Sequence, residues 1–231
     1  MTSGLPHTQV WDYSYLMDDE GIQVEFRLTY RGPLPADSSH RSERHSDRMV
    51  AVKHDIRVAL HPQIENFWKS HPSTKIPGNA ANAKFTEQGL SFWEHYANQH
   101  KVVDKSSRIH RFAPLITGKN CYGCAVNVLF LRRDMPDMPL IHQGDLDNRI
   151  KILFDALRMP SCTKELVDSP QPTEQNPCFC LVENDKYIDH VSVTTDRLLA
   201  PVGEKESIED VIIVVHVVAR VMDYELYFSP I

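Results

Sequence analysis

Apolar residues recur at every second position in three stretches of the chain, and this period is typical of β-strands. Residues 23–30, QVEFRLTY, alternate between apolar and polar side chains, so one face of this strand is expected to meet a core. Residues 125–133 place two valines and a phenylalanine on one face. In residues 211–222 every odd position is apolar, whereas the even face carries His216 and Arg220. The pattern therefore predicts three core strands, spread over the whole length of the chain.

Three shorter segments are also predicted to be strands. Residues 108–117 form a moderate candidate, and the turn GKNCYGC separates them from the strand at 125–133. We expect these two strands to form a hairpin. The segments FCLVEND, at 179–185, and KYIDHVSVTTDR, at 186–197, are expected to form two strands or one broken strand.

Apolar residues at helical spacing predict three helices. The first covers residues 42–60, and Pro62 is expected to interrupt it. A second helix is expected over residues 85–99. The third runs from about Asn148 to Arg158, with an apolar stripe on one side. The stripe consists of Ile150, Leu153, Phe154 and Leu157.

The order of these elements predicts one α/β domain over residues 1–231, with a mixed sheet and flanking helices. Between the third helix and the next strand lies a segment with four prolines and little periodicity, at 159–178. Because a compact domain rarely holds so long a structureless loop, we interpret this segment as an insertion or a mobile lid.

Composition restricts the partners and the compartment. The 231 residues carry a formal net charge of −6, with 42% hydrophobic and 24% charged residues. This acidic balance argues against general nucleic-acid binding, although a local basic patch or a bound divalent cation would still attract phosphate. We expect no membrane association and a cytoplasmic protein, because the chain has no visible export signal and no apolar run long enough to cross a bilayer.

The five cysteines fit a reducing compartment. Residues 121–124, CYGC, have the spacing of a zinc ligand pair, but the chain has no second pair of this kind. We therefore expect ordinary reduced cysteines and no structural zinc.

The segment GDLDNRIKILFDAL, at 144–157, carries the strongest chemical signal. Asp145 and Asp147 point to the same side if the chain before the helix is extended. Lys151 lies one helical turn beyond Asp147, on the same face. Carboxylate oxygens are the ligands that Mg²⁺ prefers, and a fixed cation beside them can hold a phosphate. These residues therefore indicate a magnesium site for phosphoryl chemistry.

A structural interpretation of the same residues has roughly even weight when they are taken alone. Asp147 stands where a helix N-cap belongs, and a cap followed by a solvated acid would need no metal. The cluster Glu183-Asn184-Asp185 favours the metal interpretation. It follows a predicted strand, whose end could deliver a third carboxylate to the site.

The run D-L-D-N-x-x-K-x-x-x-D-A-L, followed at a distance by an acidic pair and a strand, resembles the RusA-type Holliday junction resolvases. The matching positions are the motif residues Asp145, Asp147, Asn148, Lys151 and Asp155, and the later pair Asn184 and Asp185. The second member of that pair carries the family's chemistry. Asparagine stands at the first, where the family has an acid.

The resemblance implies a small α/β Mg²⁺-dependent endonuclease that acts as a homodimer on branched DNA during recombination and repair. By resemblance, Asp145, Asp147 and Asp185 would hold Mg²⁺, with Mn²⁺ as a possible substitute, and Lys151 would assist at the phosphate. Asn148 and Asp155 would have supporting roles. Arg149 and Lys186 are candidates for DNA contacts.

The resemblance covers roughly residues 108–222. The N-terminal strand and helices, within residues 1–107, are an elaboration outside it, and so is the 159–178 loop. Two alternatives stay open: a metal nuclease acting on flaps, single strands or RNA, and a non-catalytic module that keeps the fold and binds nucleic acid or protein.

Overall fold

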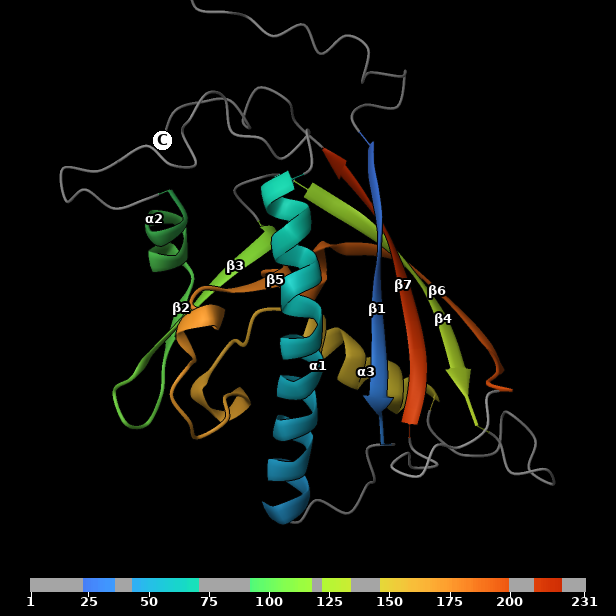
Figure 1. The fold of residues 1–231 in the computed structure, drawn as a ribbon, viewed down its shortest axis with the longest axis horizontal. Helices are drawn as coiled ribbons and strands as arrows, with labels where there is room; N and C mark the ends of the chain where they lie inside the picture. Colours follow the sequence, from blue (N-terminus) through green and yellow to red (C-terminus); the bar gives the residue numbers. More distant parts are fainter. Residues whose placement is uncertain are drawn as a thin grey trace, which may run out of the picture.

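The computed structural model describes residues 23–35, 43–70, 92–117, 122–133, 146–199 and 210–221. These residues form a mixed α/β fold with two sheets and three α-helices, which confirms the predicted class (Figure 1). The helices are α1 (Glu43–Ser70), α2 (Phe92–Gln99) and α3 (Leu146–Leu157). The strands are β1 (Gln23–Pro33), β2 (Lys101–Val103), β3 (Ile109–Ile116), β4 (Tyr122–Arg132), β5 (Cys178–Val182), β6 (Ile188–Arg197) and β7 (Asp210–Val221).

The larger sheet has the strand order β1-β7-β4-β6. β7 runs antiparallel to both β1 and β4, whereas β4 and β6 are parallel. The odd residues of β7 from Val211 to Ala219 are buried, as their spacing predicted. They meet the inward residues of β1 and β4 and the apolar faces of α1 and α3 in one continuous core. His216, on the opposite face, lies 3.0 Å from the Glu25 carboxylate.

The smaller sheet has the order β2-β3-β5, with β3 and β5 parallel. The predicted hairpin of β3 and β4 is therefore wrong, because the two strands belong to different sheets. β5 has the sequence CFCLV and is buried at all five positions. Such a fully apolar strand is typical of parallel pairing inside a core, and it takes the place beside β3 that the hairpin would have given to β4. β4 pairs instead with β6 and β7.

α1 continues to Ser70, so the predicted interruption at Pro62 is also wrong. The proline removes one helical hydrogen bond and costs about 3 kcal/mol. Beyond it, however, the apolar stripe continues with Ile64 and Trp68, which are 1% and 5% exposed. Burying two such side chains contributes about 3–6 kcal/mol, enough to offset the proline. The second predicted helix is seen as α2, whereas residues 85–91 lie outside the described residues.

The segment at 159–178 has fixed contacts with the rest of the fold. The Gln171 side chain accepts a hydrogen bond from the Arg111 backbone N–H and donates one to the Arg111 carbonyl, at 2.8 and 2.9 Å. Thr163 donates to the Val103 carbonyl. These contacts favour the insertion over the lid. None of the helices in the described ranges combines the length and apolar character that crossing a bilayer requires.

Candidate functional site at the start of α3

α3 begins at the end of the larger sheet where β1, β4 and β6 finish. Strand pairing joins Arg132 to Val211 and to Arg197, and Gly32 to Val211, so the ends of β1, β4 and β6 lie level with the start of β7. The Arg149 guanidinium, in the first turns of α3, donates a hydrogen bond of 2.5 Å to the Leu34 carbonyl just beyond β1. α3 then runs under the sheet with Ile150, Leu153 and neighbouring apolar residues buried.

Asp147 and Lys151 form an ion pair on the exposed face of α3. The Lys151 Nζ lies 2.6 Å from the Asp147 Oδ2, and the two side chains are 65% and 77% exposed, respectively. The predicted shared face is therefore confirmed. A solvated pair at this spacing contributes only about 0.3–0.5 kcal/mol. Both groups are thus accessible to a ligand at little cost to the fold.

The helix starts two residues earlier than the capping interpretation requires. Its first residue is Leu146, so Asp147 stands inside the first turn and is not the N-cap. The positive end of the helix still favours its carboxylate there. Asp145 lies outside the described residues, and the pair of Asp145 and Asp147 therefore stays a prediction.

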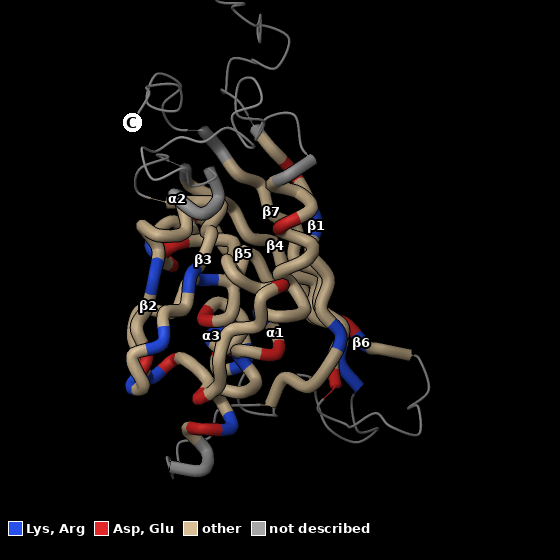
Figure 2. The backbone as a smooth tube through the Cα atoms, turned by 60° about the vertical axis from the view of Figure 1, so that its left-hand side comes forward, with Lys and Arg blue, Asp and Glu red and all other residues tan. Residues whose placement is uncertain are grey.

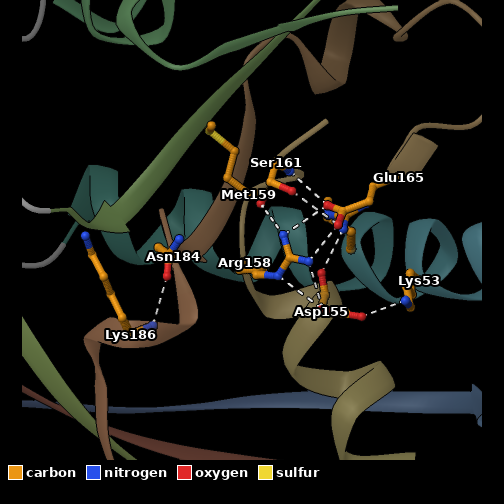
Figure 3. Close-up of polar contacts among 9 residues, drawn as sticks. Lys53, Asp155, Arg158, Met159, Ser161, Glu165, Asn184 and Lys186 are labelled. Atoms are coloured by element: carbon orange, nitrogen blue, oxygen red, sulfur yellow. Dashed lines mark hydrogen bonds and ion pairs between the residues drawn. The ribbon is translucent and has the colours of Figure 1, made fainter. Parts of the chain in front are cut away.

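Asp155 serves as the centre of an ion-pair network at the other end of α3 (Figure 3). Its Oδ2 accepts a 2.6 Å hydrogen bond from Lys53 of α1, and its Oδ1 accepts bonds from Arg158 at 2.9 and 3.1 Å. Arg158 also donates two bonds to Glu165, at 2.8 and 3.0 Å. Asp155 therefore joins α1 to α3, and Arg158 extends the network to the 159–178 segment. The supporting role of Asp155 at a metal site stays a prediction.

The electrostatics of this network favour the charged forms of Glu165 and Arg158. Burial opposes the charge of Glu165, but the hydrogen bonds from Arg158 outweigh it, and the pKa of Glu165 is lowered. Burial likewise opposes the charge of Arg158, and its two carboxylate partners raise the pKa of the guanidinium. The carboxyl of Asp155 is thus committed to structural contacts.

Asp185 follows β5, as the sequence predicted. Its neighbour Asn184 caps a short 3-10 turn, Asp185–Tyr187, by accepting a 3.1 Å hydrogen bond from the Lys186 backbone N–H. Asp185 itself is exposed. The Lys186 Nζ lies 5.0 Å from the centre of the Tyr187 ring. Both charged side chains are therefore available at the surface.

Two contacts locate Asp185 relative to α3. Val182 pairs with Arg158 in an isolated parallel bridge and accepts a hydrogen bond from the Met159 N–H. The end of β5 therefore lies beside the residues that directly follow α3, and Figure 1 shows β5 near this end of the helix. A helix of 12 residues spans about 18 Å. The structure thus brings Lys151 to Asp147 and leaves Asp185 at the opposite end of the helix.

Sequence reasoning missed the arginines that gather where α3 begins. Arg132 ends β4 and Arg133 follows it, and both are buried, whereas Arg197 ends β6 and is exposed. Figure 2 shows Lys, Arg, Asp and Glu positions clustered at the end of β6. These residues come from separate strands. The sequence did contain a signal for these arginines. The tripeptides LRR, at 131–133, and TDR, at 195–197, end apolar or alternating runs, and strand pairing brings these two ends together.

Compared with protein-family models, curated proteins and solved structures, the chain gives no significant match. The resemblance to the resolvases thus rests on the motif residues alone. Within the part of the chain that the structure describes, no group of three or more His, Cys, Asp or Glu side chains could hold a metal ion. Because Asp145 is outside that part, the proposed ligand set stays a prediction.

Proposed function

We propose that the chain is a Mg²⁺-dependent endonuclease that cleaves phosphodiesters in branched DNA such as Holliday junctions. The observation that carries this proposal is the exposed pair of Asp147 and Lys151 at the start of α3. It stands inside the D-L-D-N-x-x-K motif, next to strand ends that carry arginines. Lys151 and Arg197 are exposed there and could contact DNA phosphates, whereas Arg132 and Arg133 are buried.

The residues fit a hard cation. The Asp147 carboxylate is exposed and accepts a hydrogen bond only from Lys151 among the described residues, so its oxygens can be taken over by a metal. Bound Mg²⁺ would polarise the phosphodiester and lower the pKa of an attacking water. Asp145 and Asp147 would hold it. Lys151, released from Asp147, would then turn its ammonium to the scissile phosphate and stabilise the developing charge.

Asp185 enters the proposal through the resemblance, as the third ligand. Asp185 lies three residues beyond Val182, which pairs with Arg158 just after α3, and this position favours a different role. From there, Asp185 and Lys186 would contact the DNA at a distance from the cut bond. A non-catalytic DNA-binding module is the second candidate function, and the separation of Asp185 from Asp147 is the observation that favours it.

The proposed homodimer needs a surface other than the edges of β7. The resemblance implies a homodimer, but both edges of the apolar strand β7 are occupied, by β1 and β4. The outer edge of β6 lacks a strand partner among the described residues, and most of β6 is exposed. A second copy pairing along β6 would extend the larger sheet, and two copies related by a twofold axis suit a symmetric junction.

The test is cleavage of labelled four-way junction, flap, duplex, single-stranded DNA and RNA, with Mg²⁺, Mn²⁺ or EDTA. We expect junction cleavage that requires the metal and is lost in Asp147→Asn, whose melting temperature and metal-free junction affinity stay near those of the wild type. Asp168→Asn is the matched control, because Asp168 is also an exposed, ion-paired aspartate. If the wild type and every variant bind the junction without cleaving it, the result would support the non-catalytic DNA-binding module. If flaps or RNA are cleaved in preference to junctions, they would replace branched DNA as the proposed substrate.

A further inference from the structure

The hairpin of β2 and β3 turns one of its faces to solvent. Strand pairing sets Lys101 opposite Arg111 and Val103 opposite Ile109. Because side chains alternate along a strand, these two pairs lie on the same face. The residues between them turn to the other face, where His110 is buried. Figure 2 shows Lys and Arg positions beside β2, at the edge of the molecule. The hairpin therefore presents two cations and two aliphatic side chains together.

Lys101 and Arg111 form a cross-strand pair of like charge. Directly opposite residues have Cβ atoms about 4.5–5.5 Å apart, so two cations in these positions repel each other and destabilise the hairpin. The Arg111 Nε donates a 3.0 Å hydrogen bond to the Asn98 side chain, whose amide is neutral. Within the described ranges, no carboxylate forms an ion pair with either cation. An anionic partner would remove this repulsion.

Val103 and Ile109 add an apolar patch beside the two cations. The two residues are 48% and 46% exposed. Single exposed apolar residues are normal on a protein surface, whereas a directly opposed pair offers a contiguous patch. Farther along β3 the same face is closed, since Ala113 and Leu115 are buried. The exposed surface is thus restricted to four residues, which we call the hairpin face: Lys101, Val103, Ile109 and Arg111.

A buried carboxylate fixes the conformation of the hairpin. The Asp104 side chain, at the turn, is 5% exposed and accepts hydrogen bonds from the backbone N–H groups of Ser106 and Arg108, at 2.8 and 2.9 Å. It also pairs with the Arg108 guanidinium, and its Oδ2 lies 3.1 Å from the His110 Nε2. A surface that is already ordered loses little conformational entropy when a ligand binds. The hairpin face is therefore prepared for binding.

We propose that the hairpin face binds the sugar-phosphate backbone of a DNA arm. Lys101 and Arg111 would each contact a phosphate, and the two aliphatic side chains would pack on the neighbouring deoxyribose rings. The inference rests on the proposed function, because it names a second contact with the same substrate. It draws on Lys101 and Val103, which lie outside the residues that resemble the resolvases.

The position of the hairpin favours a branched substrate. β2 lies beyond the end of α3, on the opposite side from the start of that helix, where Asp147 stands (Figure 1). The hairpin face would therefore hold DNA at a distance from the bond that is cut. The diverging arms of a junction can occupy both places at once.

The test is binding of a fluorescent four-way junction in EDTA, measured by anisotropy at several chloride concentrations. Each phosphate contact contributes about 0.9 to the slope of log affinity against log salt. Lys101→Gln and Arg111→Gln should each bind several-fold more weakly and lower this slope by about that amount. Val103→Thr should also bind more weakly, but with an unchanged slope, because no charge is lost. None of these variants should lower the melting temperature, since the like-charge pair is itself destabilising.

Lys105→Gln is the matched control. It removes the same charge from the same hairpin, but residue 105 lines a hollow together with three aspartates, which repel phosphate. We expect this variant to bind like the wild type. The three aspartates are Asp47, Asp104 and Asp168. An equal loss of affinity in Lys105→Gln would assign the effect to net charge and overturn the proposal.

The other outcomes separate this proposal from the proposed function. Wild-type affinity and slope in either Lys101→Gln or Arg111→Gln would overturn the hairpin face and leave the endonuclease standing. The expected losses in a chain that does not cleave would support the hairpin face and overturn the endonuclease. Absence of junction binding by the wild type would overturn the hairpin face, and cleavage with Mg²⁺ would then decide the endonuclease separately. If the two variants lose binding to phosphatidylserine vesicles and keep junction binding, the face belongs to a lipid surface and the DNA proposal is overturned.

Discussion

Arg158 pairs with Val182 in an isolated parallel bridge, and this contact sets the position of Asp185. Asp185 follows Val182 by three residues, whereas Asp147, in the first turn of α3, precedes Arg158 by eleven residues. The family motif treats the two aspartates as one metal site. In the structure they lie near opposite ends of one helix, so their contributions to metal binding can be separated by substitution.

The first prediction concerns this separation. Asp185→Asn should leave the Mg²⁺ concentration for half-maximal cleavage unchanged within about twofold, because the side chain lies away from the start of α3. Junction affinity should change instead, since a surface charge near the DNA is lost. The measurement is cleavage rate against Mg²⁺ concentration, beside junction binding in EDTA. A large rise in the Mg²⁺ requirement would restore Asp185 as a ligand and would require the end of β5 to move.

The sequence alone was sufficient to predict the strands and the helix whose hydrophobic pattern is local. Each of β1, β4 and β7 has an alternating or half-apolar pattern, and the α3 prediction erred by two residues at its start and by one at its end. The Asp147–Lys151 pair followed from helical spacing alone. Such features depend on periods of 2 and 3.6 residues, which the sequence carries directly.

Relations between distant segments could not be predicted in the same way. The pairing of β3 with β5 joins residues more than 60 positions apart, and nothing local distinguishes it from a hairpin with β4. The continuation of α1 through Pro62 depends on burial of Ile64 and Trp68, which only the tertiary fold provides. The burial of Arg57, which is 3% exposed, likewise depends on the meeting of α1, β3 and the 159–178 segment. Its one sequence signal was a lone arginine in an apolar helical stripe, which is compatible with many structures.

The second prediction concerns Asp155, the centre of the network between α1 and α3. Asp155→Ala should lower the free energy of unfolding by about 1–3 kcal/mol, because Lys53 and Arg158 lose a partner in a partly exposed setting. Urea unfolding of the two proteins measures the difference. Lys151→Met is the control, since its exposed ion pair contributes less than about 0.5 kcal/mol. Equal stability of Asp155→Ala and wild type would contradict the structural role of Asp155.

The third prediction concerns acid stability. Because the pKa of Glu165 is lower in the folded protein than in the unfolded chain, its contribution is fully present above the unfolded value of about 4.3. It is lost as the pH falls through the lower folded value. Glu165→Gln should therefore be less stable than the wild type at pH 7, and the difference should shrink below pH 4. Urea unfolding at a series of pH values measures this, and a difference that does not depend on pH would contradict it.

The last prediction concerns Lys151, whose ammonium neutralises Asp147 in the absence of metal. Lys151→Met should bind Mg²⁺ more tightly, because the Asp147 oxygens lose a competing cation. Cleavage should nevertheless fall about 100-fold or more, since the charge that stabilises the phosphate is gone. Lys151→Arg should recover part of the rate. The paired measurements are Mg²⁺ titration of the free protein and single-turnover junction cleavage at saturating Mg²⁺. Tighter metal binding together with slower cleavage separates this role from a purely structural one, in which both quantities would stay at their wild-type values. A Lys151→Met variant that cleaves at the wild-type rate would remove Lys151 from the proposed mechanism.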